Sequence, residues 1–80
     1  MIFLKQLERF RNLDNLIEQE KTGAPFELAE KLEISRSHLY RLLSDLKDYG
    51  AEIKYCRKKN TFQYTKPFNF NKNINKLQKN

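Results

Sequence analysis

Hydrophobic residues recur along this chain with two different periods, and the change of period divides it into helices and a hairpin. From residue 3 to residue 20 apolar side chains return every three or four positions, which predicts one amphipathic helix. Segments beginning at Pro25 and just after Ser35 repeat that period and predict two more helices. After Gly50 the period becomes two, which is typical of a β-hairpin. The apolar positions are Leu7, Phe10, Leu13, Leu16 and Ile17, then Leu28, Ala29 and Leu32, then Leu39, Leu42, Leu43 and Leu46, and finally Ile53, Tyr55, Phe62 and Tyr64.

Residues with special backbone or capping properties mark the ends of the predicted helices. We expect Thr22-Gly23 to end the first helix, because glycine permits a left-handed turn. Pro25 suits the first position of the second helix, and Glu27 can accept hydrogen bonds from N–H groups at its start. Ser35 is the predicted N-cap of the third helix, which Gly50 ends.

Three helices followed by a hairpin predict a mainly α fold with a small β-hairpin, an α+β domain over residues 1–66. This order of elements is that of a winged helix-turn-helix, in which the hairpin is the wing. Residues 67–80 are rich in Asn and Lys and poor in apolar side chains, so we expect them to be disordered. An alternative stays open, in which Phe68 and Phe70 pack back on the first helix.

Positive charge is concentrated at one end of the chain. Residues 1–52 contain eight Lys or Arg against ten Asp or Glu, whereas residues 53–80 contain eight Lys or Arg and no acid. The net charge of +6 therefore comes from the hairpin and the tail. A concentrated basic end indicates a polyanionic partner, usually nucleic acid. The plainer alternative is a solvated basic segment.

Composition argues against several other classes of protein. No run approaches about 18 apolar residues, and charged residues directly follow Met1–Leu4, so we expect neither a membrane span nor a signal peptide. Cys56 is the single cysteine, which fits a reducing cytoplasm. His38 is the single histidine, and no nucleophile–base pair, metal cluster or phosphate loop is evident. We therefore expect no enzyme activity, no metal and no cofactor.

The middle of the chain resembles the helix-turn-helix signature. Its apolar positions are matched by Leu28, Leu32, Ile34, Leu39 and Leu42, and its small residue by Ala29. Glu33 departs from the signature, because it stands where a left-handed turn favours Gly, and a side chain there costs about 1 kcal/mol or somewhat more.

A closer resemblance covers about residues 13–68. The string SRSHLYRLLSDLKDYGAEIKY is similar to the recognition helix and first wing strand of small bacterial winged helix-turn-helix domains. These include the N-terminal domains of WYL-type and DeoR-type regulators and of the biotin-ligase repressor. Such relatives usually carry an effector-binding or catalytic domain downstream. We expect none here, so the resemblance implies no small-molecule ligand.

The polar face of the third predicted helix is the first candidate site. No acid lies between Glu33 and Asp45, and the side chains opposite the leucines suit a DNA groove. Arg can bridge guanine O6 and N7, while Ser and His can reach base edges or phosphates. The alternative is the ordinary polar face of an amphipathic helix. The candidates are Ser35, Arg36, Ser37, His38, Tyr40, Arg41 and Ser44.

The predicted wing is the second candidate site. Arg57, Lys58 and Lys59 stand at its tip with no acid nearby in sequence, and Lys54 lies on its first strand. We expect these cations to lie along DNA phosphates, although simple solvation is the alternative. The wing aromatics are expected to cover the core rather than stack on bases.

Together these features predict a small transcriptional regulator or accessory factor that binds double-stranded DNA. The third helix would read the major groove and the wing would hold phosphates. The alternative is a protein–protein adaptor, because fold does not fix function. Surplus apolar surface at Ile2, Phe3 and Leu4 leaves open either a homodimer through the first helix or an N-terminus folded over the core. Residues 67–80 are alternatively a basic arm that follows the DNA backbone.

Overall fold

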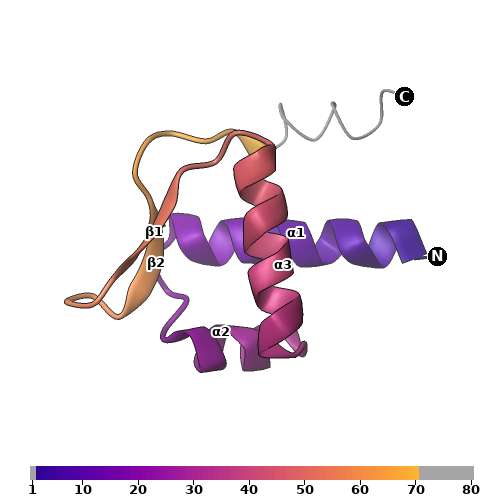
Figure 1. Cartoon of the computed structure of the whole chain (residues 1–80), viewed down its shortest axis with the longest axis horizontal. Helices are drawn as coiled ribbons and strands as arrows, with labels where there is room; N and C mark the ends of the chain where they lie inside the picture. Colours follow the sequence, from indigo (N-terminus) through magenta and orange to yellow (C-terminus); the bar gives the residue numbers. More distant parts are fainter. Residues whose placement is uncertain (1, 71–80) are drawn as a thin grey trace.

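Within residues 2–70, three helices and a two-stranded antiparallel hairpin follow one another (Figure 1). The computed structural model describes residues 2–70, with side chains from Lys5 onward. This mixed α+β architecture confirms the predicted fold class and is consistent with a winged-helix layout. The elements are α1 (Ile2–Glu18), α2 (Pro25–Leu32), α3 (Arg36–Asp48), β1 (Ile53–Cys56) and β2 (Thr61–Tyr64).

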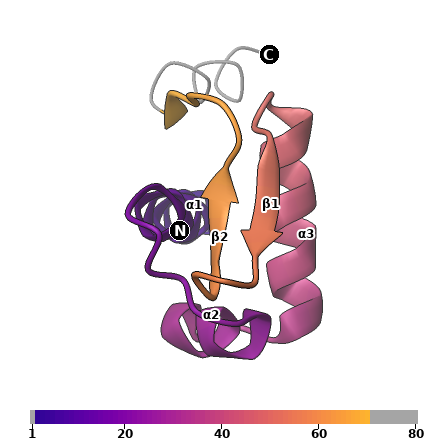
Figure 2. The same ribbon diagram turned by 90° about the vertical axis from the view of Figure 1, so that its left-hand side faces the viewer.

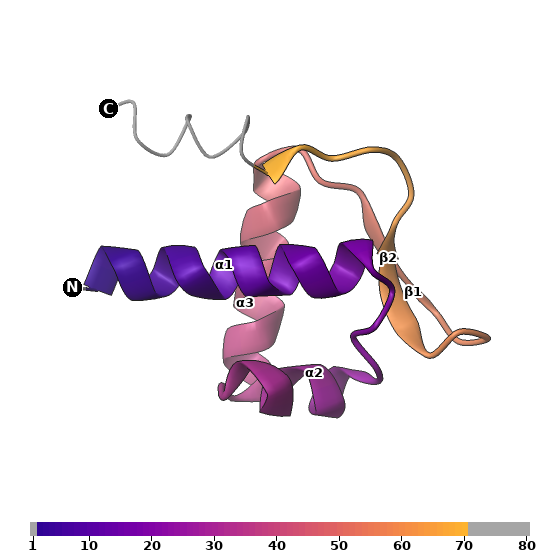
Figure 3. The ribbon, with the colours of Figure 1, turned by 180° about the vertical axis from the view of Figure 1, so that it is seen from behind.

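The helix α3 crosses α1, and the other elements are arranged around this crossing (Figures 1 and 3). The hairpin stands at the C-terminal end of α1, and α2 lies at the N-terminal end of α3. Within the hairpin, β2 lies toward α1 and β1 toward α3 (Figure 2). The N-terminal end of α1 projects beyond α3 on the side away from the hairpin. The wing and this end of α1 therefore flank α3 on opposite sides.

The core lies where the apolar stripes of the helices meet the inner face of the hairpin. Leu13, Ile17, Leu28 and Leu39 are fully buried, as the helical period predicts. Each such side chain contributes about 1.5–3 kcal/mol when it leaves water. The remaining buried apolar residues are Phe10, Ala29, Leu32, Leu42, Leu43, Leu46, Ala51, Phe62 and Phe70.

The end of α1 differs from the prediction. The helix stops at Glu18, and the left-handed residue that ends it is Glu20, with φ 57°, rather than Gly23. Lys21 N donates to Leu16 O at 3.0 Å, the Schellman pattern usually built on glycine. The prediction placed the end too late because it relied on that preference.

Gly23 is needed for a different reason. Its φ is 74°, and a Cβ atom there would lie 2.8 Å from Glu27 Oε1. That oxygen accepts a 2.8 Å hydrogen bond from Ala24 N, so the predicted cap of α2 is confirmed. The glycine therefore leaves room for the carboxylate that begins α2.

The turn between α2 and α3 is left-handed at Glu33, with φ 58° and ψ 45°. Ile34 N donates to Ala29 O at 3.0 Å, which closes the turn without glycine. Ser35 Oγ then accepts a 3.1 Å hydrogen bond from His38 N, which confirms the predicted N-cap of α3. The turn thus fixes how α3 leaves α2.

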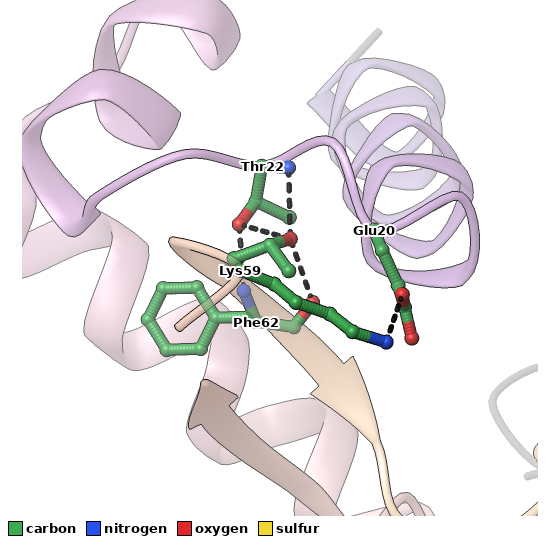
Figure 4. A network of polar contacts seen from close by, with 5 residues as sticks. Glu20, Thr22, Lys59 and Phe62 are labelled. Carbon is green, nitrogen blue, oxygen red and sulfur yellow. Dashed lines mark hydrogen bonds and ion pairs between the residues drawn. The ribbon is translucent and has the colours of Figure 1, made fainter. Parts of the chain in front are cut away.

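Two buried threonines join the loop after α1 to the hairpin, as Figure 4 shows. Phe62 N donates to Thr22 Oγ1 at 2.8 Å, and Thr22 N donates to Thr61 Oγ1 at 3.1 Å. Both threonines are completely buried. Thr61 is the first residue of β2, so this contact fixes the start of that strand to the loop after α1.

The hairpin is also tied to α1 by a second polar contact. Tyr64 Oη donates to Asp14 Oδ1 at 2.6 Å, and Asp14 is only 8% exposed. Burial raises the pKa of the Asp14 carboxyl, although the hydrogen bond from Tyr64 opposes that rise. Burial is the main cause that raises the pKa of Tyr64, and the neighbouring Asp14 raises it further.

The segment after β2 returns to the core. Phe70 is buried, and Phe68 is partly buried with its ring 5.4 Å from that of Tyr64. These two side chains are therefore packed. The expectation of disorder is wrong for them, and the alternative, in which they pack back on the domain, describes them better. The domain boundary after Lys66 stays a prediction, and residues 71–80 lie outside the described part of the chain.

Candidate nucleic-acid interface

One side of α3 is exposed along its length. Arg36, Ser37, Tyr40, Arg41 and Ser44 are all exposed, with Tyr40 at 53%. Their spacing places them together on one face of the helix. The leucines of α3 are buried on the other face. This face therefore presents two guanidinium groups and three hydroxyl groups to solvent.

The two arginines of this face are free to bind a ligand. Neither Arg36 nor Arg41 forms a side-chain hydrogen bond or an ion pair with any residue that the structure describes. Lys47 is a further exposed cation on the same face that was not among the predicted residues, and the exposed acid Asp48 follows it. The signal was available, because Lys47 continues the spacing of Arg36, Tyr40 and Ser44.

Two of the predicted α3 candidates are placed differently. The oxygen of Ser35 already accepts the hydrogen bond from His38 N, so its O–H donor and one lone pair remain for a ligand. His38 is partly buried and faces α1, where it lines a hollow with Lys5, Gln6 and Arg9. His38 thus lies beside the exposed face rather than on it.

Three of the four wing candidates are exposed and unpaired within residues 5–70. These are Lys54, Arg57 and Lys58. Lys59 has an acidic partner that is distant in sequence, because its Nζ lies 3.2 Å from Glu20 Oε1 (Figure 4). The two residues are 39 positions apart, so proximity in sequence did not reveal the pair.

A second ion pair forms at the base of the wing. Lys66 Nζ lies 3.3 Å from Glu52 Oε2. The hydrogen bond from Lys66 lowers the pKa of Glu52. Exposed pairs of this kind contribute little to stability, because water and salt screen them. They nevertheless neutralise part of the positive charge that the sequence assigns to the hairpin.

Hydrogen bonds hold the wing tip in a defined conformation. Asn60 is left-handed, with φ 54°, and accepts a hydrogen bond from Tyr55 Oη. Its Nδ2 donates to Glu27 Oε1 at 3.4 Å, which links the tip to α2. Phe62 is buried, and Tyr55 and Tyr64 pack against the core. The wing aromatics therefore cover the core, as predicted.

Neither a metal site nor a membrane-spanning helix is found among the described residues. No group of His, Cys, Asp or Glu side chains among them could hold a metal ion. No helix in that part of the chain is long and apolar enough to cross a membrane.

Comparison with known proteins adds no relative. The chain matches no protein-family model, and neither the curated proteins nor the solved structures contain a detectable match.

Proposed function

We propose that this protein binds double-stranded DNA in a sequence-specific manner, as a small transcriptional regulator or accessory factor. The observation that carries the proposal is the exposed face of α3 from Arg36 to Ser44, which has two unpaired arginines and no acid among the described residues. Nucleic acid is the polyanion that such a face suits best.

In this proposal α3 enters the major groove. An α-helix fits that groove, which is about 12 Å wide, and its arginines can form paired hydrogen bonds to guanine O6 and N7. Arg36 and Arg41 are the residues assigned to base edges. Ser37, Tyr40 and Ser44 supply hydroxyl groups to bases or phosphates, and Ser35 retains one donor.

The wing holds the DNA backbone in the same proposal. Lys54, Arg57 and Lys58 provide exposed charges without an acidic partner in the described residues. Phosphate contact needs only proximity and opposite charge, so it carries no sequence information. Lys59 takes a smaller part, because Glu20 already neutralises it. The resemblance to bacterial winged helix-turn-helix domains agrees with this division of roles.

The proposal assigns the protein to the cytoplasm and gives it no cofactor, metal or catalytic role. A homodimer through α1 is part of it, because one module of this size binds DNA with modest affinity. The projecting N-terminal end of α1 provides a place for that contact (Figure 1). The side chains of Ile2, Phe3 and Leu4 lie outside the described residues.

The second candidate function is a protein–protein adaptor. It is favoured by Phe26, which is 57% exposed at the start of α2. An isolated exposed aromatic residue is common on protein surfaces, so this observation weighs less than the unpaired arginines.

Selection of bound sequences from random duplex DNA tests the proposal. We expect enrichment of a defined site and salt-dependent retention of the protein on duplex DNA. If no duplex is retained at low salt, DNA binding is wrong and the adaptor becomes the better account.

A further inference from the structure

A polar hollow lies in the angle between the N-terminal end of α1 and the first turn of α3. Lys5, Gln6 and Arg9 line it from α1, and His38 lines it from α3. Its volume is about 380 Å³. It belongs neither to the exposed face of α3 nor to the wing.

Helix geometry explains why these side chains meet. Lys5 and Arg9 are four residues apart, and Gln6 and Arg9 are three apart, so all three lie along one side of α1. His38 precedes the buried Leu39 and lies at the edge of the leucine face of α3, which crosses α1 (Figures 1 and 3). Arg9 and His38 are both partly buried, which restricts their side chains at this crossing.

The lining residues are suited to a phosphate. An ammonium, a guanidinium, an amide and an imidazole all can donate hydrogen bonds, and no carboxylate lines the hollow. Within residues 5–70, Lys5 and Arg9 have no ion-pair partner. The hollow also borders the first turn of α3, where the positive end of the helix dipole adds to the attraction.

The position of the hollow complements that of the wing. The N-terminal end of α1 and the hairpin project on opposite sides of α3 (Figures 1 and 3). A major groove is bordered by two phosphate backbones. A helix in that groove would bring the wing to one backbone and the hollow to the other.

We propose that the hollow between Lys5, Arg9 and His38 binds a phosphate group, and that in a DNA complex this group belongs to the backbone across the groove from the wing. The backbone assignment rests on the proposed function. The phosphate site itself does not, because it follows from the donors that line the hollow.

The test removes the two charges in the full-length chain. We expect Lys5→Gln/Arg9→Gln to make the slope of log affinity against log salt shallower by about 0.9 for each phosphate that is no longer neutralised. Lys5→Arg/Arg9→Lys retains both charges and should restore the slope. Arg11→Gln/Lys21→Gln removes two exposed charges elsewhere and should leave the slope near wild type. A cooperative thermal unfolding transition is the check that each variant is folded.

A second measurement uses inorganic phosphate on the protein alone. His38 is the single histidine, so its imidazole NMR signals are assigned directly. A free-phosphate site predicts saturable shifts of these signals at constant ionic strength, which Lys5→Gln/Arg9→Gln abolishes. Saturable shifts with an unchanged duplex slope would identify free phosphate as the ligand and overturn the backbone assignment.

The two measurements separate this inference from the proposed function. An unchanged slope together with no saturable phosphate shift overturns the phosphate site. If the wild-type protein binds no duplex, the proposed function and the backbone assignment both fail. The phosphate titration then decides alone, and an unresponsive His38 overturns the site.

Discussion

Asp14 is the most informative single residue for stability. Its carboxyl is buried on α1, where it accepts the hydrogen bond from Tyr64 Oη. Burial raises its pKa above the ordinary value of 3.8. At pH values between the ordinary pKa and the raised pKa of the folded state, the folded protein binds more protons than the unfolded chain. The contribution of Asp14 to stability is therefore present at low pH and decreases as pH rises through its folded pKa.

The variant Asp14→Asn removes this dependence, because asparagine does not ionise and still offers Oδ1 to Tyr64. We expect the free energy of unfolding of Asp14→Asn, relative to wild type, to increase between pH 3 and pH 7. Urea unfolding at several pH values measures the difference. A difference that stays constant with pH would show that folding does not raise the pKa of Asp14.

Among contacts between elements, the hydrogen bonds that join β2 to the loop after α1 are expected to matter most for stability. Thr22→Val keeps the shape of the side chain but removes the oxygen that accepts from Phe62 N. A buried N–H group without a partner costs about 1–3 kcal/mol, so we expect a loss of that size in the free energy of unfolding. Urea unfolding is the measurement.

A matched control is Thr65→Val, just after β2. Thr65 is exposed, and its hydroxyl contacts Glu52 near the surface. Such surface changes are usually within about 0.5 kcal/mol of wild type. Equal effects of the two substitutions would contradict a special role for the buried threonine pair.

The cations of the wing are expected to differ in how much they contribute to DNA affinity. Arg57→Ala/Lys58→Ala should lower affinity for specific and random duplexes by similar factors, because these residues are assigned to phosphates. The salt slope should become shallower by about 0.9 for each phosphate that the variant no longer neutralises. Lys59→Ala should have a smaller effect, since Lys59 pairs with Glu20. An unchanged slope for the double variant would show that the wing does not lie along the backbone.

The features that could be predicted are those that depend on local sequence patterns. The helical stripes, the Ser35 cap and the hairpin aromatics depend on residues a few positions apart. The Thr22–Thr61 and Glu20–Lys59 contacts join segments 39 residues apart, so no period or neighbour revealed them. The end of α1 was misplaced because Glu20 adopts a conformation that usually belongs to glycine.

Contacts between distant segments also limit how much of the candidate site could be predicted from the sequence. The exposed face of α3 follows from the spacing of its leucines and could be predicted. The hollow depends on how α1 crosses α3, and it brings Lys5 and Arg9 beside His38. Neither α1 residue was a sequence candidate, because each has an ordinary place on an amphipathic helix.

At the scale of the whole molecule, the projecting end of α1 makes self-association testable. We expect sedimentation at several concentrations to detect a dimer, because the sequence begins this helix with the apolar residues Ile2, Phe3 and Leu4. Phe3→Ser should weaken the association. A monomer at high micromolar concentration, both alone and on DNA, would rule out this dimer.

The central claim is that α3 reads a DNA sequence, and the affinities of Arg36→Ala and Arg41→Ala for the selected duplex test it most directly. Both side chains are exposed and contribute nothing to the core, so the variants should remain folded. We predict that each loses about 1–3 kcal/mol on the selected site and less on random duplex, because base contacts provide the discrimination between sequences. Arg11→Ala, an exposed arginine on α1, is the control. If both α3 variants bind the selected site as tightly as wild type, α3 is not the reading helix.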